Sequence, residues 1–106
     1  MYPKRYLPCP TPQPPTRYSL RLVLSILIVT WNTRDLLVRC LEAVQASATG
    51  LGIETETIVV DNGSIDGSAE VVRSRFPSVR LITNDRNRGY ALANNQAYAV
   101  SRGDLV

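Results

Sequence analysis

Residues 57–68, with the sequence TIVVDNGSIDGS, carry the side chains in this chain that are best suited to binding or chemistry. An apolar, β-branched run leads directly into Asp61 and Asn62, and Gly63 follows in the loop. A carboxylate at the end of a buried strand is costly unless it meets hydrogen-bond donors. Asp61 therefore either caps backbone N–H groups of its own loop or accepts a hydrogen bond from a ligand, such as a pyrimidine ring N–H or a sugar hydroxyl.

Two other segments also place polar side chains directly after an apolar run. One follows residues 22–29, and the other is the polar loop at residues 84–89. The carboxyl ends of parallel strands lie along one edge of a sheet, where open α/β proteins bind their ligands. We therefore expect the three loops to converge on one site. The residues expected to contact the ligand are Thr30, Trp31, Asn32, Asp61, Asn62, Gly63, Asn87 and Gly89.

Several neighbours of these residues allow two interpretations. Trp31 could stack on a base or close the edge of the core. Arg86 and Arg88 precede a predicted helix, and both arginine side chains and helix N-termini suit phosphate, but the same residues could form a solvated loop. Asp66 is favoured as a helix N-cap. The asparagine pair at residues 94–95, within a predicted helix, is expected to face the cleft because asparagine is a poor helix former.

The elements that must position these loops alternate along the chain. Apolar runs and helical spacing predict, in order, a strand at 22–29, a helix at 34–47, a strand at 56–61, a helix at 67–76, a strand at 79–83 and a helix at 89–101. This order predicts a parallel sheet with right-handed crossovers. Residues 103–106 have the pattern of a fourth strand's first residues. We therefore expect a sheet that is incomplete at the C-terminus and has an exposed edge.

Helix ends and faces follow from the same pattern. Thr33 is the expected N-cap of the first helix, and Cys40 falls on the apolar side of that helix together with Leu36 and Leu37. Cys9 lies in the N-terminal segment, so the two cysteines are predicted to be free thiols of a reducing compartment.

Composition divides the chain in two. Six of the seven prolines lie in the first 15 residues, and residues 1–20 carry Lys4, Arg5 and Arg17 without an acid. We interpret residues 1–20 as a basic, disordered tail and residues 21–106, with nine arginines and nine acidic residues, as the folded domain. The basic excess therefore belongs to the tail, which argues against nucleic acid as a partner.

Other functions are excluded by what the sequence lacks. The chain has no histidine, which excludes Ser-His-Asp and Cys-His catalysis within it. Neither G-x-G-x-x-G nor G-x-x-x-x-G-K-[ST] occurs, so a dinucleotide site and a P-loop are not expected. The apolar run at 22–31 is shorter than the roughly 20 residues that span a bilayer.

Residues 24–32, 59–68 and 87–95, in this order and spacing, resemble family 2 glycosyltransferases of the GT-A fold, with features of bacterial rhamnosyltransferase-like members. The resemblance covers about residues 23–106. It implies a three-layer α/β/α fold with a Rossmann-like parallel sheet. It also implies an enzyme that transfers a sugar, with inversion, from a UDP- or dTDP-linked donor to a cell-surface polysaccharide or lipid-linked acceptor. It also implies that Thr30 and Trp31 line the base pocket, where many members have tyrosine in place of Trp31.

The same resemblance assigns further roles. Asp61 would accept the base N–H, Asn87 and Gly89 would shape the loop near the donor, and Asp66 would be structural. The family's Asp-x-Asp metal motif and catalytic base normally follow the fourth strand, so Asp104 is not expected to be a ligand. A divalent ion, Mg²⁺ or Mn²⁺, is expected for the full-length enzyme and none for this chain, which we expect to be inert alone. The full protein would be cytoplasmic, with possible peripheral attachment to the inner membrane face.

Two alternatives remain open from the residues alone. One is a non-enzymatic nucleotide-binding or regulatory module with a flavodoxin-like sheet. The other is an interaction protein whose proline-rich tail binds a partner.

Overall fold

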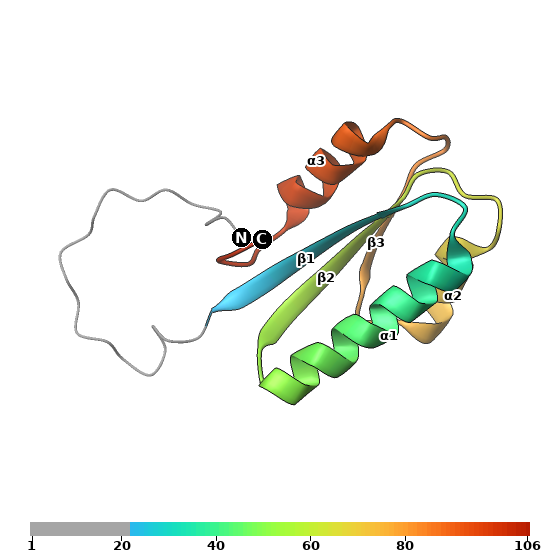
Figure 1. Ribbon diagram of the computed structural model, residues 1–106. Coiled ribbons are helices and arrows are strands. Elements are labelled where there is room, and N and C mark those ends of the chain that lie inside the picture. The colour runs from blue at the N-terminus through green and yellow to red at the C-terminus, as the bar shows by residue number, and fades with distance from the viewer. Residues whose placement is uncertain (1–21) are drawn as a thin grey trace, which may run out of the picture.

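The computed structural model describes residues 22–106, so the predicted tail lies outside the described residues. The predicted alternation of strands and helices is confirmed (Figure 1). The elements are β1 (Val23–Thr30), α1 (Arg34–Leu51), β2 (Glu54–Asp61), α2 (Ser68–Arg75), β3 (Arg80–Thr83) and α3 (Tyr90–Val100). The largest boundary shift is at the end of α1, which continues to Leu51 and stops at Gly52, whose φ of 64° is the left-handed conformation that glycine adopts readily.

The three strands form a parallel sheet in the order β1-β2-β3. Ile28 pairs with Val59, which in turn pairs with Leu81. On the other edge of β1, Leu105 forms a parallel bridge with Leu24, and the Ser25 N–H donates to the Leu105 carbonyl at 2.8 Å. The predicted fourth strand is thus present as a single bridge. Strand order reverses at β1, and in open α/β sheets such a reversal marks the ligand crevice.

Helices cover both faces of the sheet, which gives the predicted three layers (Figure 1). On one face, α1 and α2 bury a cluster around β2 that consists of Leu37, Leu41, Val59, Val72 and Phe76. On the other face, α3 packs closely through two alanines against the strands, in a cluster of Ile58, Val60, Ala93 and Ala97. The strand between these clusters is β2, whose residues 58–61 are buried on both sides.

The apolar side predicted for α1 is partly wrong. Leu36 is 63% exposed, and Cys40 is an exposed free thiol. The helix buries Leu37 and Leu41 against β2 and α2, so the flank that carries Cys40 faces the strip beside β1. There Cys40, Leu24 and Ile26 line part of an open apolar groove of about 310 Å³. None of the helices within residues 22–106 has the length and hydrophobicity to cross a membrane.

A polar cluster fastens the amino ends of the strands. The Glu56 Oε1 atom accepts hydrogen bonds from the Ser25 hydroxyl at 2.6 Å, from the Gly103 N–H at 3.0 Å and from the Arg102 N–H. The Arg80 guanidinium lies 3.8 Å from Oε2. This Glu56 cluster ties the segment after α3 to all three strands.

Candidate functional site at the carboxyl edge

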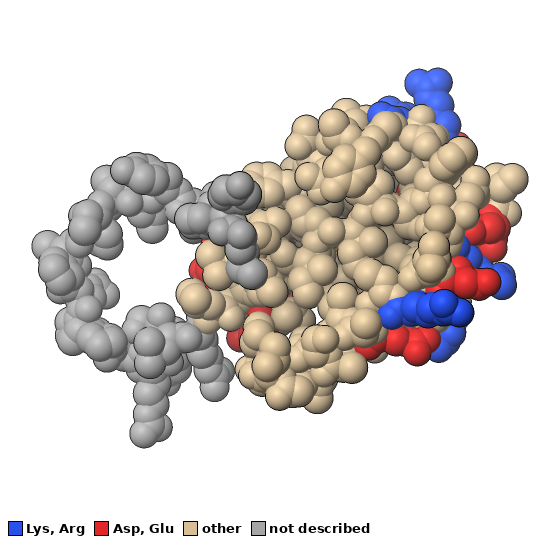
Figure 2. All heavy atoms as spheres, viewed as in Figure 1, with Lys and Arg blue, Asp and Glu red and all other residues tan. Residues whose placement is uncertain are grey.

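The three predicted loops converge at the carboxyl edge of the sheet. The Asn62 N–H donates to the Thr30 carbonyl at 2.9 Å, and the Asn84 N–H donates to the Asp61 carbonyl at 2.9 Å. These bonds continue the two strand pairings by one residue, so the loop after β2 lies between the other two. Figure 2 shows that charged side chains gather chiefly at this end of the molecule, whereas the middle of the same face is largely uncharged.

Asp61 is 3% exposed at the end of β2. Its Oδ1 accepts the Ser64 N–H at 3.2 Å, as the capping interpretation predicts. Its Oδ2 has no hydrogen-bond partner among residues 22–106. Because no fully buried side-chain nitrogen or oxygen in those residues lacks a partner, Oδ2 must reach solvent. One carboxylate oxygen therefore supports the loop, while the other has no hydrogen-bond partner in those residues and keeps a small contact with solvent.

Asn32 fastens the loop after β1 to the loop after β2. Its backbone N–H donates to the Ser64 hydroxyl at 2.8 Å, and its side-chain Oδ1 accepts the Ile65 N–H at 2.9 Å. Its φ of 52° lies in the left-handed region, which asparagine tolerates better than most residues. The Asn32 side chain is thus engaged by protein, while the neighbouring Trp31 side chain is 52% exposed and does not close the core.

Asn62 is the centre of a side-chain network at the same edge. It is 2% exposed. Its Oδ1 accepts from the Arg88 N–H at 3.0 Å and the Asn84 Nδ2 at 3.1 Å. Its Nδ2 donates to the Asn87 Oδ1 at 3.1 Å and the Gly89 carbonyl at 3.2 Å. An amide can accept two hydrogen bonds and donate two, so every position is filled by protein.

Two glycines shape the same loops. Gly63 has a φ of 84°, and a Cβ built on it would lie 2.7 Å from backbone atoms of Arg86. Only a residue without a side chain allows the loops after β2 and β3 to come this close. Gly89 has a φ of 86° and open space around it, and its N–H donates to the Asn87 Oδ1 at 2.8 Å.

The polar residue of α3 that joins the Asn62 network is Gln96, and not one of the two asparagines that were expected to face the cleft. The amides of Gln96 and Asn84 exchange two hydrogen bonds, of 2.8 and 3.0 Å, and so extend the Asn62 network into the helix. Asn94 and Asn95 take no part in it, and Asn95 is exposed. Gln96 was missed because a glutamine in a helix is unremarkable. The sequence did contain a sign of this network: three asparagines, at positions 62, 84 and 87, follow two neighbouring strands.

Arg88 and Arg86 differ in their partners. The Arg88 guanidinium pairs with the Asp85 carboxylate at 3.1 Å, and this hydrogen bond lowers the pKa of Asp85 below its ordinary value. The Arg86 side chain has no hydrogen bond or ion pair within residues 22–106, and it is exposed. Arg86 also lowers the pKa of Asp85 through its charge, but it is the arginine of this loop without a direct ion pair.

Asp66 supports two helix starts. Its Oδ1 accepts the Ser68 hydroxyl at 2.5 Å and the Ser68 N–H at 3.1 Å, and its Oδ2 accepts the Arg34 N–H at 2.9 Å. These hydrogen bonds, that from the Ser68 hydroxyl above all, lower the pKa of Asp66. Gly67, and not Asp66, occupies the N-cap position of α2, and Thr33 caps α1 without a side-chain bond to the helix. The Thr33 hydroxyl instead bonds that of Thr30 at 3.0 Å.

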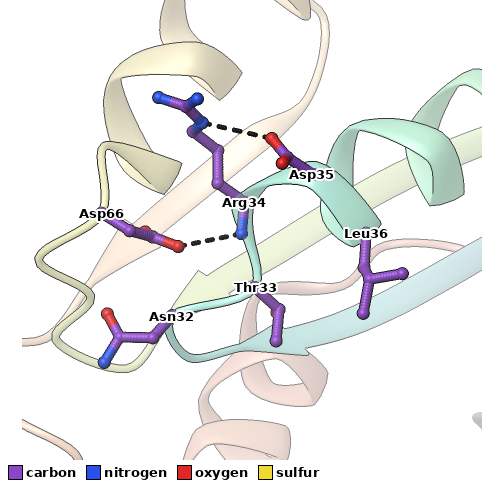
Figure 3. Close-up of a pocket in the computed structure, with 6 residues that line it drawn as sticks. All are labelled: Asn32, Thr33, Arg34, Asp35, Leu36 and Asp66. Atoms are coloured by element: carbon purple, nitrogen blue, oxygen red, sulfur yellow. Dashed lines mark hydrogen bonds and ion pairs between the residues drawn. The ribbon is translucent and has the colours of Figure 1, made fainter.

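An open hollow of about 390 Å³ lies at the start of α1. Figure 3 shows the Asp66 carboxylate directed at the Arg34 backbone and the Arg34 guanidinium directed at Asp35, 3.5 Å away. The charged side chains that line this hollow therefore already have protein partners. The lining residues are Asn32, Thr33, Arg34, Asp35, Leu36 and Asp66. Elsewhere, too, residues 22–106 contain no group of three acidic or cysteine side chains that could hold a metal ion.

Comparison with known proteins agrees with this architecture. The family model described as "Glycosyl transferase family 2" matches residues 25–106. The chain is 35% identical over 83 residues to the succinoglycan biosynthesis protein ExoO of Rhizobium meliloti, which covers 77% of this chain and 23% of that protein. It is 31% identical over 77 residues to an N-acetylglucosaminyl-diphospho-decaprenol L-rhamnosyltransferase of Mycobacterium tuberculosis, covering 73% of this chain and 24% of that protein.

A solved structure has a similar fold. It is a mannosyltransferase from Pyrobaculum calidifontis in complex with GDP-mannose and Mn²⁺, with a TM-score of 0.65 at 24% identity over 80% of this chain and 26% of that one. The chain thus spans about a quarter of the length of the proteins it matches. The family match over residues 25–106, the identity to curated relatives and the shared GT-A architecture lead to one conclusion: the chain belongs to glycosyltransferase family 2.

Proposed function

We propose that this chain forms the donor-nucleotide portion of an inverting glycosyltransferase. The whole protein would transfer a sugar from a UDP- or dTDP-linked donor to a cell-surface polysaccharide or lipid-linked acceptor. Within that protein, residues 22–106 would bind and orient the donor. No residue in this described part is assigned to the chemical step.

The Asp61 carboxylate is the observation that carries this proposal. It is held at Oδ1 by the Ser64 N–H while Oδ2 reaches solvent at the carboxyl edge. Uracil and thymine present one ring N–H between two carbonyls, which suits a single, fixed acceptor. Trp31, half exposed in the loop after the neighbouring strand, supplies an aromatic face for the base. The Arg86 side chain makes no direct hydrogen bond or ion pair in the described residues and acts on Asp85 only through its charge, so its guanidinium suits the diphosphate.

The names of the relatives support the choice of acceptor. One acts in succinoglycan biosynthesis and another is a decaprenol-linked rhamnosyltransferase. A third, from Pseudomonas savastanoi pv. phaseolicola, is an undecaprenyl-phosphate 4-deoxy-4-formamido-L-arabinose transferase, 35% identical over 94 residues, which span 84% of this chain and 27% of that protein. Acceptors of this kind support a cytoplasmic protein, attached peripherally to the inner membrane face.

A divalent ion is part of the proposal for the whole protein, as in the mannosyltransferase complex with Mn²⁺. Such an ion would offset the negative charge that builds on the departing diphosphate. Residues 22–106 do not fit it, because they contain no cluster of ligands.

The test is a transfer assay on the protein at its native length, whose intact mass also shows whether the chain continues past Val106. The protein is incubated with Mn²⁺, radiolabelled UDP-, dTDP- or GDP-sugars and an undecaprenyl-linked acceptor, alongside the 106-residue chain alone. We expect transfer from a pyrimidine donor by the native protein and none by the short chain. Transfer from GDP-sugars only, or no transfer by a native protein that ends at Val106, would overturn the proposal.

A further inference from the structure

The loop after β3 has few means of holding its own shape. Residues 85–89 lie between β3 and α3, and all of them are exposed. Within the loop, Asn87 accepts the Gly89 N–H and Arg88 pairs with Asp85. An exposed ion pair of this kind contributes little order. The remaining side-chain hydrogen bonds between the loop and the rest of the protein all involve Asn62, and the Arg86 backbone also packs closely against Gly63.

Asn62 holds the loop at three successive residues. It donates to the Asn87 side chain and the Gly89 carbonyl, and it accepts the Arg88 N–H. The fourth bond, from Asn84, connects it to Gln96 of α3. Because Asn62 is nearly excluded from water, its own amide groups could not fully replace these partners with solvent, so the buried amide holds the exposed loop in one arrangement.

We infer that Asn62 is a positioning residue that orders the 85–89 loop beside Asp61 before the donor arrives. This inference rests on the proposed function and refines the prediction that Asn62 contacts the ligand itself, since no donor or acceptor of its amide is left for a ligand. Asn62 follows Asp61 directly in the chain, so the same residue pair supplies the base acceptor and fixes the loop that carries Arg86. Preorganisation of this kind removes the ordering cost from donor binding.

The molecule offers a matched control at its other end. Asn62→Asp is isosteric and converts the donating Nδ2 into an oxygen that faces the Asn87 Oδ1 and the Gly89 carbonyl. Glu56→Gln instead replaces a carboxylate by an amide of the same shape. It changes the Glu56 cluster, which lies at the amino ends of the strands and outside the proposed site. Both variants perturb a polar centre on β2 or directly after it, so general loss of stability affects both.

Two measurements on the native-length protein test the inference. The first is amide hydrogen exchange at Arg88 and Gly89 without ligand. The second is the Kd for UDP and dTDP by calorimetry, at a temperature where both variants are fully folded. For Asn62→Asp we expect exchange at both amides to rise about tenfold, because the two hydrogen bonds that Nδ2 donates to the loop are lost. The Kd should rise at least as much, but the new negative charge beside the diphosphate contributes to that rise, so the exchange rates decide the positioning role. Glu56→Gln should leave both within about twofold of wild type.

The outcomes separate the two proposals. Equal effects of the two variants, or unchanged exchange at Arg88 and Gly89 in Asn62→Asp, would overturn the positioning role. A wild-type protein that binds neither nucleotide would overturn the proposed function, while the exchange data would still decide whether Asn62 orders the loop.

A second variant covers the case in which Asn62→Asp does not fold. Gln96→Glu removes the hydrogen bond from Gln96 to the Asn84 Oδ1 and leaves Asn62 in place. It should then raise the same exchange rates about threefold, in line with the loss of one neutral hydrogen bond. Exchange at the wild-type rate in this variant would count against the network.

Discussion

The two ends of the sheet are fastened in chemically different ways. At the carboxyl end, the neutral amide of Asn62 joins the loops through four hydrogen bonds. At the amino end, the Glu56 carboxylate joins three donors beside the Arg80 guanidinium. Charge-assisted bonds are the stronger kind, but they depend on pH and add a local charge. The neutral centre therefore lies beside the proposed nucleotide site, and the charged centre lies at the opposite edge of the sheet, outside that proposed site.

The close approach of the loops at Gly63 gives the largest expected effect. Gly63→Ala should lower the free energy of unfolding by about 3 kcal/mol, because it combines a positive φ with a clash against the Arg86 backbone. Urea unfolding would measure this. At the amino end, Gly103→Ala would bring a Cβ to 2.8 Å from the Val23 carbonyl and against the Ser25 hydroxyl, at a φ that is not positive. We expect a smaller loss there, about 2 kcal/mol.

Gly50→Ala is the control for both glycine variants. Gly50 lies within α1, and a Cβ there would have no neighbour within 4 Å. Alanine favours a helix over glycine, so this variant should gain about 0.5–1 kcal/mol. Equal losses for Gly63→Ala and Gly50→Ala would show that the contact between the loops is not a constraint.

Removing the acceptor at Asp61 should affect binding more than stability. Asp61→Asn retains an oxygen for the Ser64 N–H but can place a donor where Oδ2 now lies. We expect UDP binding to weaken by about 10- to 100-fold, since a charged acceptor is lost and a donor then faces the base N–H. Calorimetry measures the Kd. A Kd within twofold of wild type would show that the carboxylate only caps its loop.

The Glu56 cluster predicts a stability that depends on pH. Burial raises the pKa of Glu56, but the hydrogen bonds from Ser25 and from two backbone N–H groups, together with the Arg80 charge, outweigh it and lower the pKa below 4.5. Because the pKa is lower in the folded than in the unfolded state, this stabilisation is complete above about pH 4.5 and is lost as the pH falls through the folded value.

The measurement is urea unfolding of wild type and Glu56→Gln between pH 7 and pH 3. We expect the variant to lose about 1 kcal/mol at pH 7 and less at pH 3, so the two curves should approach each other on the acid side. Asp66 and Asp85, whose pKa values are also lowered, titrate in both proteins and cancel in the difference. A difference that does not change with pH would contradict the assignment.

The exposed pair of Asp85 and Arg88 gives the smallest expected effect. Their side chains are 75% and 42% exposed, so Asp85→Asn should leave the free energy of unfolding nearly unchanged. Removing one acid beside the proposed diphosphate site should tighten UDP binding by about twofold at low ionic strength and less at high salt. Weaker binding in this variant would place the diphosphate elsewhere.

The sequence was sufficient for the elements and for the convergence of the three loops. Apolar runs such as 22–29 define buried strands, and the parallel order brings their carboxyl ends together. The sequence pattern could not predict which of two adjacent polar side chains is bound by other protein groups, because that depends on the φ and ψ angles of the loop. Asp61 and Asn62 are adjacent, yet one carries an oxygen that reaches solvent and the other is saturated by protein.

Packing details show the same limit. Cys40 shares the helical spacing of Leu37 and Leu41 but faces the open groove beside β1, because the direction in which α1 crosses the sheet is a tertiary property. The Glu56 cluster was also missed. Its signal was present, since Ser25 and Glu56 are polar residues that come into register on neighbouring strands, but register is known only once the strands are paired.

The contact between Gly63 and Arg86 also limits how the site can be re-engineered. Because their backbone atoms lie this close, the loops after β2 and β3 can be replaced together but not separately. A graft that replaces residues 84–89 alone, in order to change donor preference, would meet the unchanged turn at Gly63 and leave the Asn62 amide without matched partners. Successful exchanges should therefore move residues 61–64, residues 84–89 and Gln96 together.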